Sequence, residues 1–169
     1  MRDDIKAIIL MGVAGSGKTS TGQLLAKKLG WIFRDADSFQ PPANIAKMSA
    51  GQPLTDDDRK PWLLAIAEFI DEQIDNEKKC VVTCSALKRR YREALAGSRR
   101  DIQIIHLDGD FDLIAARMAA RKNHFMPTSL LKSQFDALEK PGPDERVWTI
   151  SVAPKTAGVV EDVLARLRM

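Results

Sequence analysis

One glycine-rich segment constrains this chain more than any other. Gly12-Val13-Ala14-Gly15-Ser16-Gly17-Lys18-Thr19 fits the pattern G-x-x-x-x-G-K-[ST] at every fixed position. It follows an apolar run at residues 5–11, which predicts a strand buried on both faces. A helical pattern at residues 18–29 comes next, and Gly30 stands where a glycine commonly ends a helix. Strand, glycine-rich loop and helix in this order predict a phosphate-binding loop.

The residue types of this loop indicate its chemistry. Glycines allow backbone N–H groups to converge on phosphate oxygens, and the start of the helix adds partial positive charge. We expect Lys18 to reach the β- and γ-phosphates of a nucleotide, and the hydroxyl of Thr19 to bind Mg²⁺. The predicted nucleotide contacts in this stretch are Gly12, Val13, Ala14, Gly15, Ser16, Gly17, Lys18, Thr19 and Ser20.

The rest of the chain alternates between strand and helix patterns. Further strands are predicted at residues 31–34, 80–84, 102–107 and 147–152. An apolar stripe predicts a helix at residues 61–75, with Pro61 in its first turn, and similar stripes follow the third, fourth and fifth strands. The alternation predicts one α/β domain over residues 1–169, built on a mostly parallel sheet.

Composition limits the partners of this domain. The 169 residues carry a net charge of +3, and Lys and Arg are spread along the chain, which argues against a nucleic-acid partner. The apolar run at residues 5–11 is too short for a signal core or a membrane span. Cys80 and Cys84 would lie about 13 Å apart on one strand, too far for a disulfide. We therefore expect a reduced, cytoplasmic protein without membrane contact.

Two carboxylates follow the second predicted strand. Asp35 and Asp37 are separated by one residue, so in extended chain both point toward the same side. One is suited to orient an attacking hydroxyl and accept its proton, and the other to bind Mg²⁺ through water. We prefer Asp37 as the base, which leaves Asp35 as a metal ligand together with Thr19.

Basic residues follow the third and fourth predicted strands. Lys88 and Arg92 come after the third strand and could hold a substrate carboxylate. Arg117 and Arg121 are spaced i, i+4 on one helix face, and the helical pattern breaks at residues 122–127. This predicts a helix that leads into a lid at about residues 118–130. Arg117 and Arg121 would reach the transferring phosphate when the lid closes, and Arg117 is also an expected nucleotide contact.

The phosphate loop alone leaves several classes of protein open. The chain lacks an N-K-x-D stretch and a D-x-x-G switch, so a GTPase is disfavoured. A kinase for a small acid such as shikimate and a nucleotide-binding regulator without catalysis both remain as alternatives. A regulator would not need Lys18, Thr19 and Asp37 together, and all three are present.

The chain resembles the gluconokinases in motifs that run from the phosphate loop to about Pro141. The matching stretches are Asn44-Ile45-x-Lys47-Met48, Gly51-x-Pro53-Leu54, Asp56-x-Asp58-Arg59-x-Pro61-Trp62-Leu63, Ser85-Ala86-Leu87-Lys88, Tyr91-Arg92, His124-Phe125-Met126-Pro127, Leu130-Leu131, Ser133-Gln134-Phe135 and Leu138-Glu139-x-Pro141. A shikimate kinase would be expected to carry three glycines after its third strand, where this chain has Ser85-Ala86-Leu87.

The resemblance implies a P-loop NTP hydrolase-like fold with three α/β/α layers, about five parallel strands and a small helical lid. It also implies a homodimer that uses ATP and Mg²⁺ to phosphorylate D-gluconate to 6-phosphogluconate, with Pro154 beside the adenine. The substrate contacts carried over or favoured by position are Asp37, Asn44, Lys47, Arg59, Lys88, Arg92, His124 and Gln134.

Overall fold

A single parallel sheet forms the centre of the molecule. The computed structural model describes residues 2–120 and 128–169. Its five strands are arranged in the order β2-β3-β1-β4-β5. They are β1 Ala7–Met11, β2 Ile32–Asp35, β3 Cys80–Thr83, β4 Ile102–Asp108 and β5 Val147–Ser151. The expected α/β class and parallel sheet are confirmed, and each strand lies within two residues of its predicted position.

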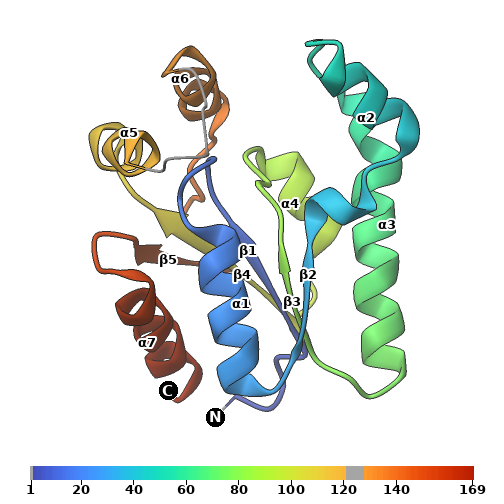
Figure 1. Cartoon of the computed structure of the whole chain (residues 1–169). Coiled ribbons are helices and arrows are strands. Elements are labelled where there is room, and N and C mark those ends of the chain that lie inside the picture. Colours follow the sequence, from blue (N-terminus) through green and yellow to red (C-terminus); the bar gives the residue numbers. More distant parts are fainter. Residues whose placement is uncertain (1, 121–127) are drawn as a thin grey trace.

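Helices cover both faces of the sheet (Figure 1). The described ones are α1 Lys18–Leu29, α2 Pro42–Ser49, α3 Asp56–Asp75, α4 Arg89–Leu95, α5 Phe111–Ala119, α6 Thr128–Ala137 and α7 Thr156–Leu167, with a 3₁₀ turn, η1, at Ala36–Phe39. Ile8 and Leu10 of β1 pack in a core with α1 and α7. Ile9 and Met11 point the opposite way into a core with α3 and α4. Successive side chains of a strand point to opposite faces of the sheet, so each face packs against its own helices. The result is three layers, with the sheet between two layers of helices.

The carboxyl edge of the sheet carries the elements that surround the site. In Figure 1, α5 and α6 lie above this edge on one side, and α2 with the upper end of α3 lies on the other. A third, smaller core joins Val13 of the phosphate loop to Ile114 and Met118 of α5 and Leu131 of α6. The phosphate loop is thus packed directly against the helices on its side.

Helix α3 begins five residues earlier than its apolar stripe predicts. Thr55 caps it, because its side chain accepts a hydrogen bond from the Asp58 N–H and the Asp58 carboxylate accepts one from the Thr55 N–H. Pro61 therefore lies inside the helix and not in its first turn. The reciprocal cap and three acidic residues in the first turn favour the earlier start.

Two sequence expectations concern membranes and the lid. Across residues 2–120 and 128–169, no helix has both the length and the apolar character to cross a membrane. The lid expected at about residues 118–130 lies mostly at residues 121–127, which are outside the described residues. Helices α5 and α6 flank that interval.

Candidate functional site

The phosphate loop joins β1 to α1 and depends on glycine at defined positions. Gly15 and Gly17 have φ angles of +78° and +89°, which side chains with a Cβ rarely adopt. A Cβ at Gly15 would lie 2.5 Å from Cγ of Met118, so α5 leaves it no room. The backbone conformation that turns N–H groups toward a ligand therefore favours glycine at both positions.

Lys18 folds back over this loop. Its Nζ donates hydrogen bonds to the Gly12 carbonyl oxygen at 2.8 Å and the Val13 carbonyl oxygen at 3.0 Å. Desolvation lowers the pKa of Lys18 to about 8, although the negative charges of Asp37 and Asp35 act in the opposite direction. The ammonium group therefore lies at the loop with its charge only partly compensated.

A cavity of about 300 Å³ lies beside the loop on the α7 side. It is lined by Gly15, Ser16, Gly17, Ser20, Thr21, Arg117, Met118, Val152, Pro154, Lys155, Thr156 and Val159. Pro154, which the resemblance places beside the adenine, is part of this lining. Within the described chain, the Ser16 hydroxyl is the buried side-chain polar atom that has no hydrogen-bond partner.

Arg117 borders this cavity and is held by the segment after β5. Its guanidinium donates to the Val152 carbonyl oxygen and, at 2.8 Å, to the Ala153 carbonyl oxygen. The sequence assigned Arg117 both to the transferring phosphate and to nucleotide binding, and here these carbonyls hold it at the wall of the cavity beside the phosphate loop. Arg121, its predicted companion, lies outside the described residues.

The two predicted carboxylates meet the phosphate loop at the end of β2. Asp35 Oδ2 accepts a hydrogen bond from the Thr19 hydroxyl at 3.0 Å, and its Oδ1 accepts one from the Asp37 N–H at 2.9 Å. Partial desolvation raises the pKa of Asp37, and Asp35 raises it further, while Lys18 acts against both. The structure thus brings the predicted base and both predicted metal ligands together.

A cavity of about 690 Å³ opens in front of these groups. Its lining is Ala14, Gly15, Gly17, Lys18, Thr19, Ser20, Asp35, Ala36, Asp37, Met48, Trp62, Thr83, Cys84, Ser85 and Gln134. A smaller cavity of about 130 Å³ is lined by Arg59, Trp62, Leu63, Cys84, Ser85, Ala86, Leu87, Lys88, Tyr91 and Ala137. Trp62, Cys84 and Ser85 border both, so the two cavities adjoin and form one acceptor cleft.

Three of the predicted substrate contacts, besides Asp37, line this cleft. Arg59 and Lys88 border the smaller cavity, and Arg59 Nη1 donates to the Tyr91 hydroxyl at 3.0 Å. Gln134 borders the larger cavity, and its Oε1 accepts the Ala14 N–H at 2.6 Å. The cleft therefore has carboxylates at the phosphate-loop end and cations at the other end.

Three other predicted contacts do not line the cleft, because other groups of the chain bind them. The Asn44 amide donates to the Asp58 carbonyl oxygen at 2.8 Å, and Lys47 Nζ pairs with the Asp58 carboxylate at 2.6 Å. Arg92 is buried and its guanidinium contacts Glu145 and two carbonyls. His124 lies outside the described residues.

Sequence reasoning missed several residues that line the cleft. Trp62 lies in the segment at residues 61–75 whose apolar stripe predicted a helix, yet its indole N–H donates at 2.8 Å to the carbonyl of Ala36, the residue between the two aspartates. Cys84 was expected only to be a free cysteine on a strand, and burial raises the pKa of its thiol to about 12. The signal that could have found both was the position of their segments at the carboxyl edge of the sheet.

Comparison with known proteins gives one consistent result. The family model described as shikimate kinase matches residues 14–142. A gluconokinase of Gluconobacter oxydans (strain 621H) is 46% identical over 157 residues, covering 93% of this chain and 88% of the relative. The thermoresistant gluconokinase of Escherichia coli (strain K12) is 41% identical over 157 residues, covering 92% and 90%.

A solved structure gives the same result. The crystal structure of a gluconokinase from Sinorhizobium meliloti 1021 superposes with a TM-score of 0.88 at 43% identity, covering 99% of this chain and 94% of that one. High identity and nearly full coverage together identify the family, and the shikimate kinase model describes the wider group with the same fold. The chain belongs to the gluconokinase family.

Proposed function

We propose that the protein transfers the γ-phosphoryl group of ATP to the terminal hydroxyl of D-gluconate, giving 6-phosphogluconate and ADP. The observation that carries the proposal is the distribution of charge in the acceptor cleft, which is negative at one end and positive at the other. Asp35 and Asp37 border its phosphate-loop end, and Arg59 and Lys88 border the other. Membership of the gluconokinase family supports the same acceptor.

Gluconate matches this distribution of charge. Its carboxylate and its terminal hydroxyl are at opposite ends of a six-carbon chain. Arg59 and Lys88 would hold the carboxylate by charge-assisted hydrogen bonds. The terminal hydroxyl would then lie near Asp37 and the phosphate loop, which is the arrangement that phosphoryl transfer requires.

Asp37 is proposed as the general base. The gluconate O6–H proton passes to the Asp37 carboxylate while O6 forms a bond to the γ-phosphorus. The bond from that phosphorus to the β,γ-bridging oxygen breaks, and ADP leaves with its electron pair. The raised pKa of Asp37 suits this role, because it brings the base closer to working pH than an ordinary carboxylate.

Lys18 and the loop glycines are proposed to hold the phosphates. Lys18 would bind β- and γ-phosphate oxygens in place of its bonds to the Gly12 and Val13 carbonyls. Thr19 and Asp35 offer adjacent oxygen atoms, the ligand type that Mg²⁺ prefers, and would hold it there. Bound Mg²⁺ would offset negative charge on the phosphates.

The nucleoside is proposed to occupy the cavity of about 300 Å³ beside the loop. Pro154 would lie against the adenine ring, and Arg117 would fix the segment that carries Pro154. The unpartnered Ser16 hydroxyl on the same wall offers a further hydrogen-bonding group.

One assay tests the proposal directly. ADP release from ATP and Mg²⁺ is measured against D-gluconate, related sugar acids, shikimate and nucleoside monophosphates. We expect gluconate to give the highest kcat/KM. Turnover with shikimate and none with gluconate would show a different small-acid kinase, and ATP binding without turnover on any acceptor would show a regulator.

Assembly and location are also proposed. A homodimer follows from the family resemblance and is tested by light scattering on the purified protein. A cytoplasmic location fits the two cysteines, Cys80 and Cys84, which are buried and free. Fractionation of cells that produce the protein tests the location.

A further inference from the structure

Residues 85–88, in the loop between β3 and α4, contribute Ser85 and Lys88 to the acceptor cleft but include a strained backbone position. Ala86 has a φ of +44°, in the left-handed region that residues with a Cβ avoid. It is almost fully buried. The Ser85 carbonyl also accepts the Gly12 N–H at 3.2 Å, which ties this loop to the phosphate loop. A strained loop of this kind keeps its shape only if its surroundings hold it.

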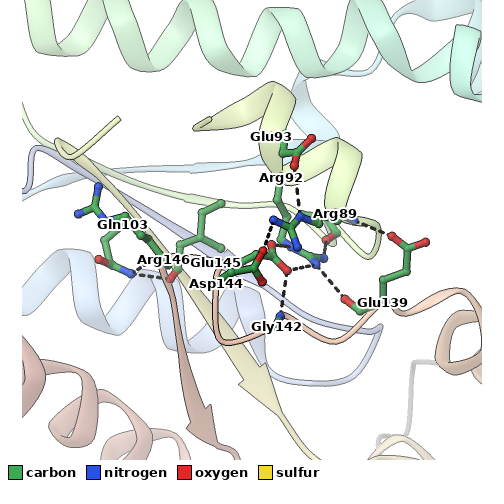
Figure 2. Close-up of polar contacts among 11 residues, drawn as sticks. Arg89, Arg92, Glu93, Gln103, Glu139, Gly142, Asp144, Glu145 and Arg146 are labelled. Carbon is green, nitrogen blue, oxygen red and sulfur yellow. Dashed lines mark hydrogen bonds and ion pairs between the residues drawn. The ribbon is translucent and has the colours of Figure 1, made fainter. Parts of the chain in front are cut away.

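Arg92 contacts this loop and two glutamates that follow α6; Figure 2 shows its bonds to Glu139 and Glu145. Its Nη1 donates to the Ala86 carbonyl oxygen at 2.9 Å, and its Nη2 donates to the Glu139 carbonyl oxygen at 2.9 Å. Glu145 binds the same guanidinium through both carboxylate oxygens, at 2.8 and 3.0 Å. Every nitrogen of the planar fork is thus used, a geometry that lysine cannot reproduce.

The segment after α6 completes the enclosure. The Glu139 N–H donates to the Leu87 carbonyl at 2.8 Å, and the Glu139 carboxylate accepts the Arg89 N–H at 2.9 Å. Glu145 also accepts the Gly142 N–H at 3.1 Å. Helix α6 itself reaches the phosphate loop through Gln134 and Ala14. The loop at residues 85–88 is therefore enclosed between α4 and the segment that follows α6.

We propose that the buried Arg92–Glu145 pair positions the loop at residues 85–88 and so sets Ser85 and Lys88 for the acceptor. This inference rests on the proposed function for the identity of that acceptor. Arg92 acts through the Ala86 carbonyl and is a positioning residue, because its side chain does not line the cleft. A buried ion pair often adds little stability over apolar packing, so its fixed geometry is the property that matters here.

The chain contains a matched control for this pair. Arg89 and Asp144 form an ion pair between the same two segments, α4 and the segment after α6, with 2.7 Å between Nη2 and Oδ2. Their side chains are 45% and 63% exposed, whereas those of Arg92 and Glu145 are 2% and 10% exposed. Exposed pairs contribute little and are screened by salt. Asp144→Asn removes the exposed pair and leaves the Ala86 contact intact.

The kinetic test compares Arg92→Lys and Glu145→Gln with Asp144→Asn and the wild type. For the first two we expect KM for gluconate to rise about tenfold while KM for ATP stays within about twofold. A merely structural role would lower the amount of active protein and leave both KM values unchanged. Unchanged KM for gluconate in both variants, or an equal rise in Asp144→Asn, would overturn the proposal.

Hydrogen exchange tests the same proposal without any acceptor. In Glu145→Gln we expect amides of residues 85–92 to exchange about tenfold faster, while those of β1 keep their wild-type rates. Equal protection of residues 85–92 in variant and wild type would contradict the positioning role. Wild-type turnover with gluconate, measured beside it, shows separately whether the proposed function holds.

Discussion

The phosphate loop and the acceptor cleft are built in opposite ways. The phosphate loop is one continuous stretch, residues 12–19, that offers mainly backbone groups between β1 and α1. The acceptor cleft is lined by side chains from separate segments: Asp37 from η1, Arg59 from α3, Ser85 and Lys88 from the loop after β3, and Gln134 from α6. Local sequence decides the geometry of the first, and packing of distant segments decides that of the second.

This difference predicts how substitutions in the two regions behave. A change in the phosphate loop alters the handling of ATP whatever the acceptor is. A change in the acceptor cleft alters the use of gluconate and leaves ATP binding near its original strength. If variants in either region changed the use of ATP and of gluconate alike, the two regions would act as one unit.

Lys18→Ala is expected to have the largest effect. The variant loses the cation proposed to bind the transferring phosphate, so kcat falls about 10²- to 10³-fold and ATP binding weakens as well. Steady-state kinetics and nucleotide titration measure both effects. Lys28→Ala is the control, because Lys28 forms an exposed pair with Glu161 on the surface. An active Lys18→Ala enzyme with normal ATP affinity would contradict the assignment.

Asp37→Asn is expected to separate the two regions most clearly. Loss of the general base lowers kcat by about 10²-fold or more, while ATP affinity changes little because the phosphate loop is intact. Asp57→Asn is a matched control, since the Asp57 side chain is 88% exposed and pairs with Lys60. Retention of wild-type kcat in Asp37→Asn would remove Asp37 from its proposed role.

The phosphate loop could be predicted from the sequence because its functional residues are close together in the chain. Its glycines, Lys18 and Thr19 lie within eight residues, so spacing alone places them together. The sheet class was predictable because strand and helix periodicities differ and alternate along the chain. The strand order was not, since it depends on which strands pair across long stretches of sequence.

The acceptor side was harder to predict because charge alone does not say which way a side chain points. Lys88 and Arg92 are four residues apart, yet Lys88 borders the cleft and Arg92 is buried behind it against Glu145. Nothing in the sequence indicates that Glu145, 53 residues away, pairs with Arg92. Trp62 shows the reverse case: it is a largely apolar residue, yet it borders the cleft and its indole N–H bonds to the Ala36 carbonyl.

Lys88→Ala is expected to have a moderate effect confined to the acceptor. One of the two proposed partners of the gluconate carboxylate is lost, so KM for gluconate rises about tenfold and KM for ATP stays near wild type. Kinetics with each substrate varied in turn measure the difference. Lys60→Ala, which changes a lysine with a 76% exposed side chain, should leave both values unchanged. A larger change in KM for ATP than for gluconate would place Lys88 with the phosphate loop.

The smallest predicted effect is the pH dependence of activity. Loss of activity at alkaline pH reports on the phosphate loop, and loss at acid pH reports on the acceptor cleft. Lys18 has a pKa of about 8, so its charge is lost as pH rises through that value, and kcat/KM for ATP should fall about fourfold between pH 7 and 8.5. On the acid side, activity falls as Asp37 is protonated, at higher pH than for an ordinary carboxylate because its pKa is raised. The alkaline limb belongs to the phosphate loop and should persist in Lys88→Ala but disappear in Lys18→Ala. An alkaline limb unchanged in Lys18→Ala would assign it to another group.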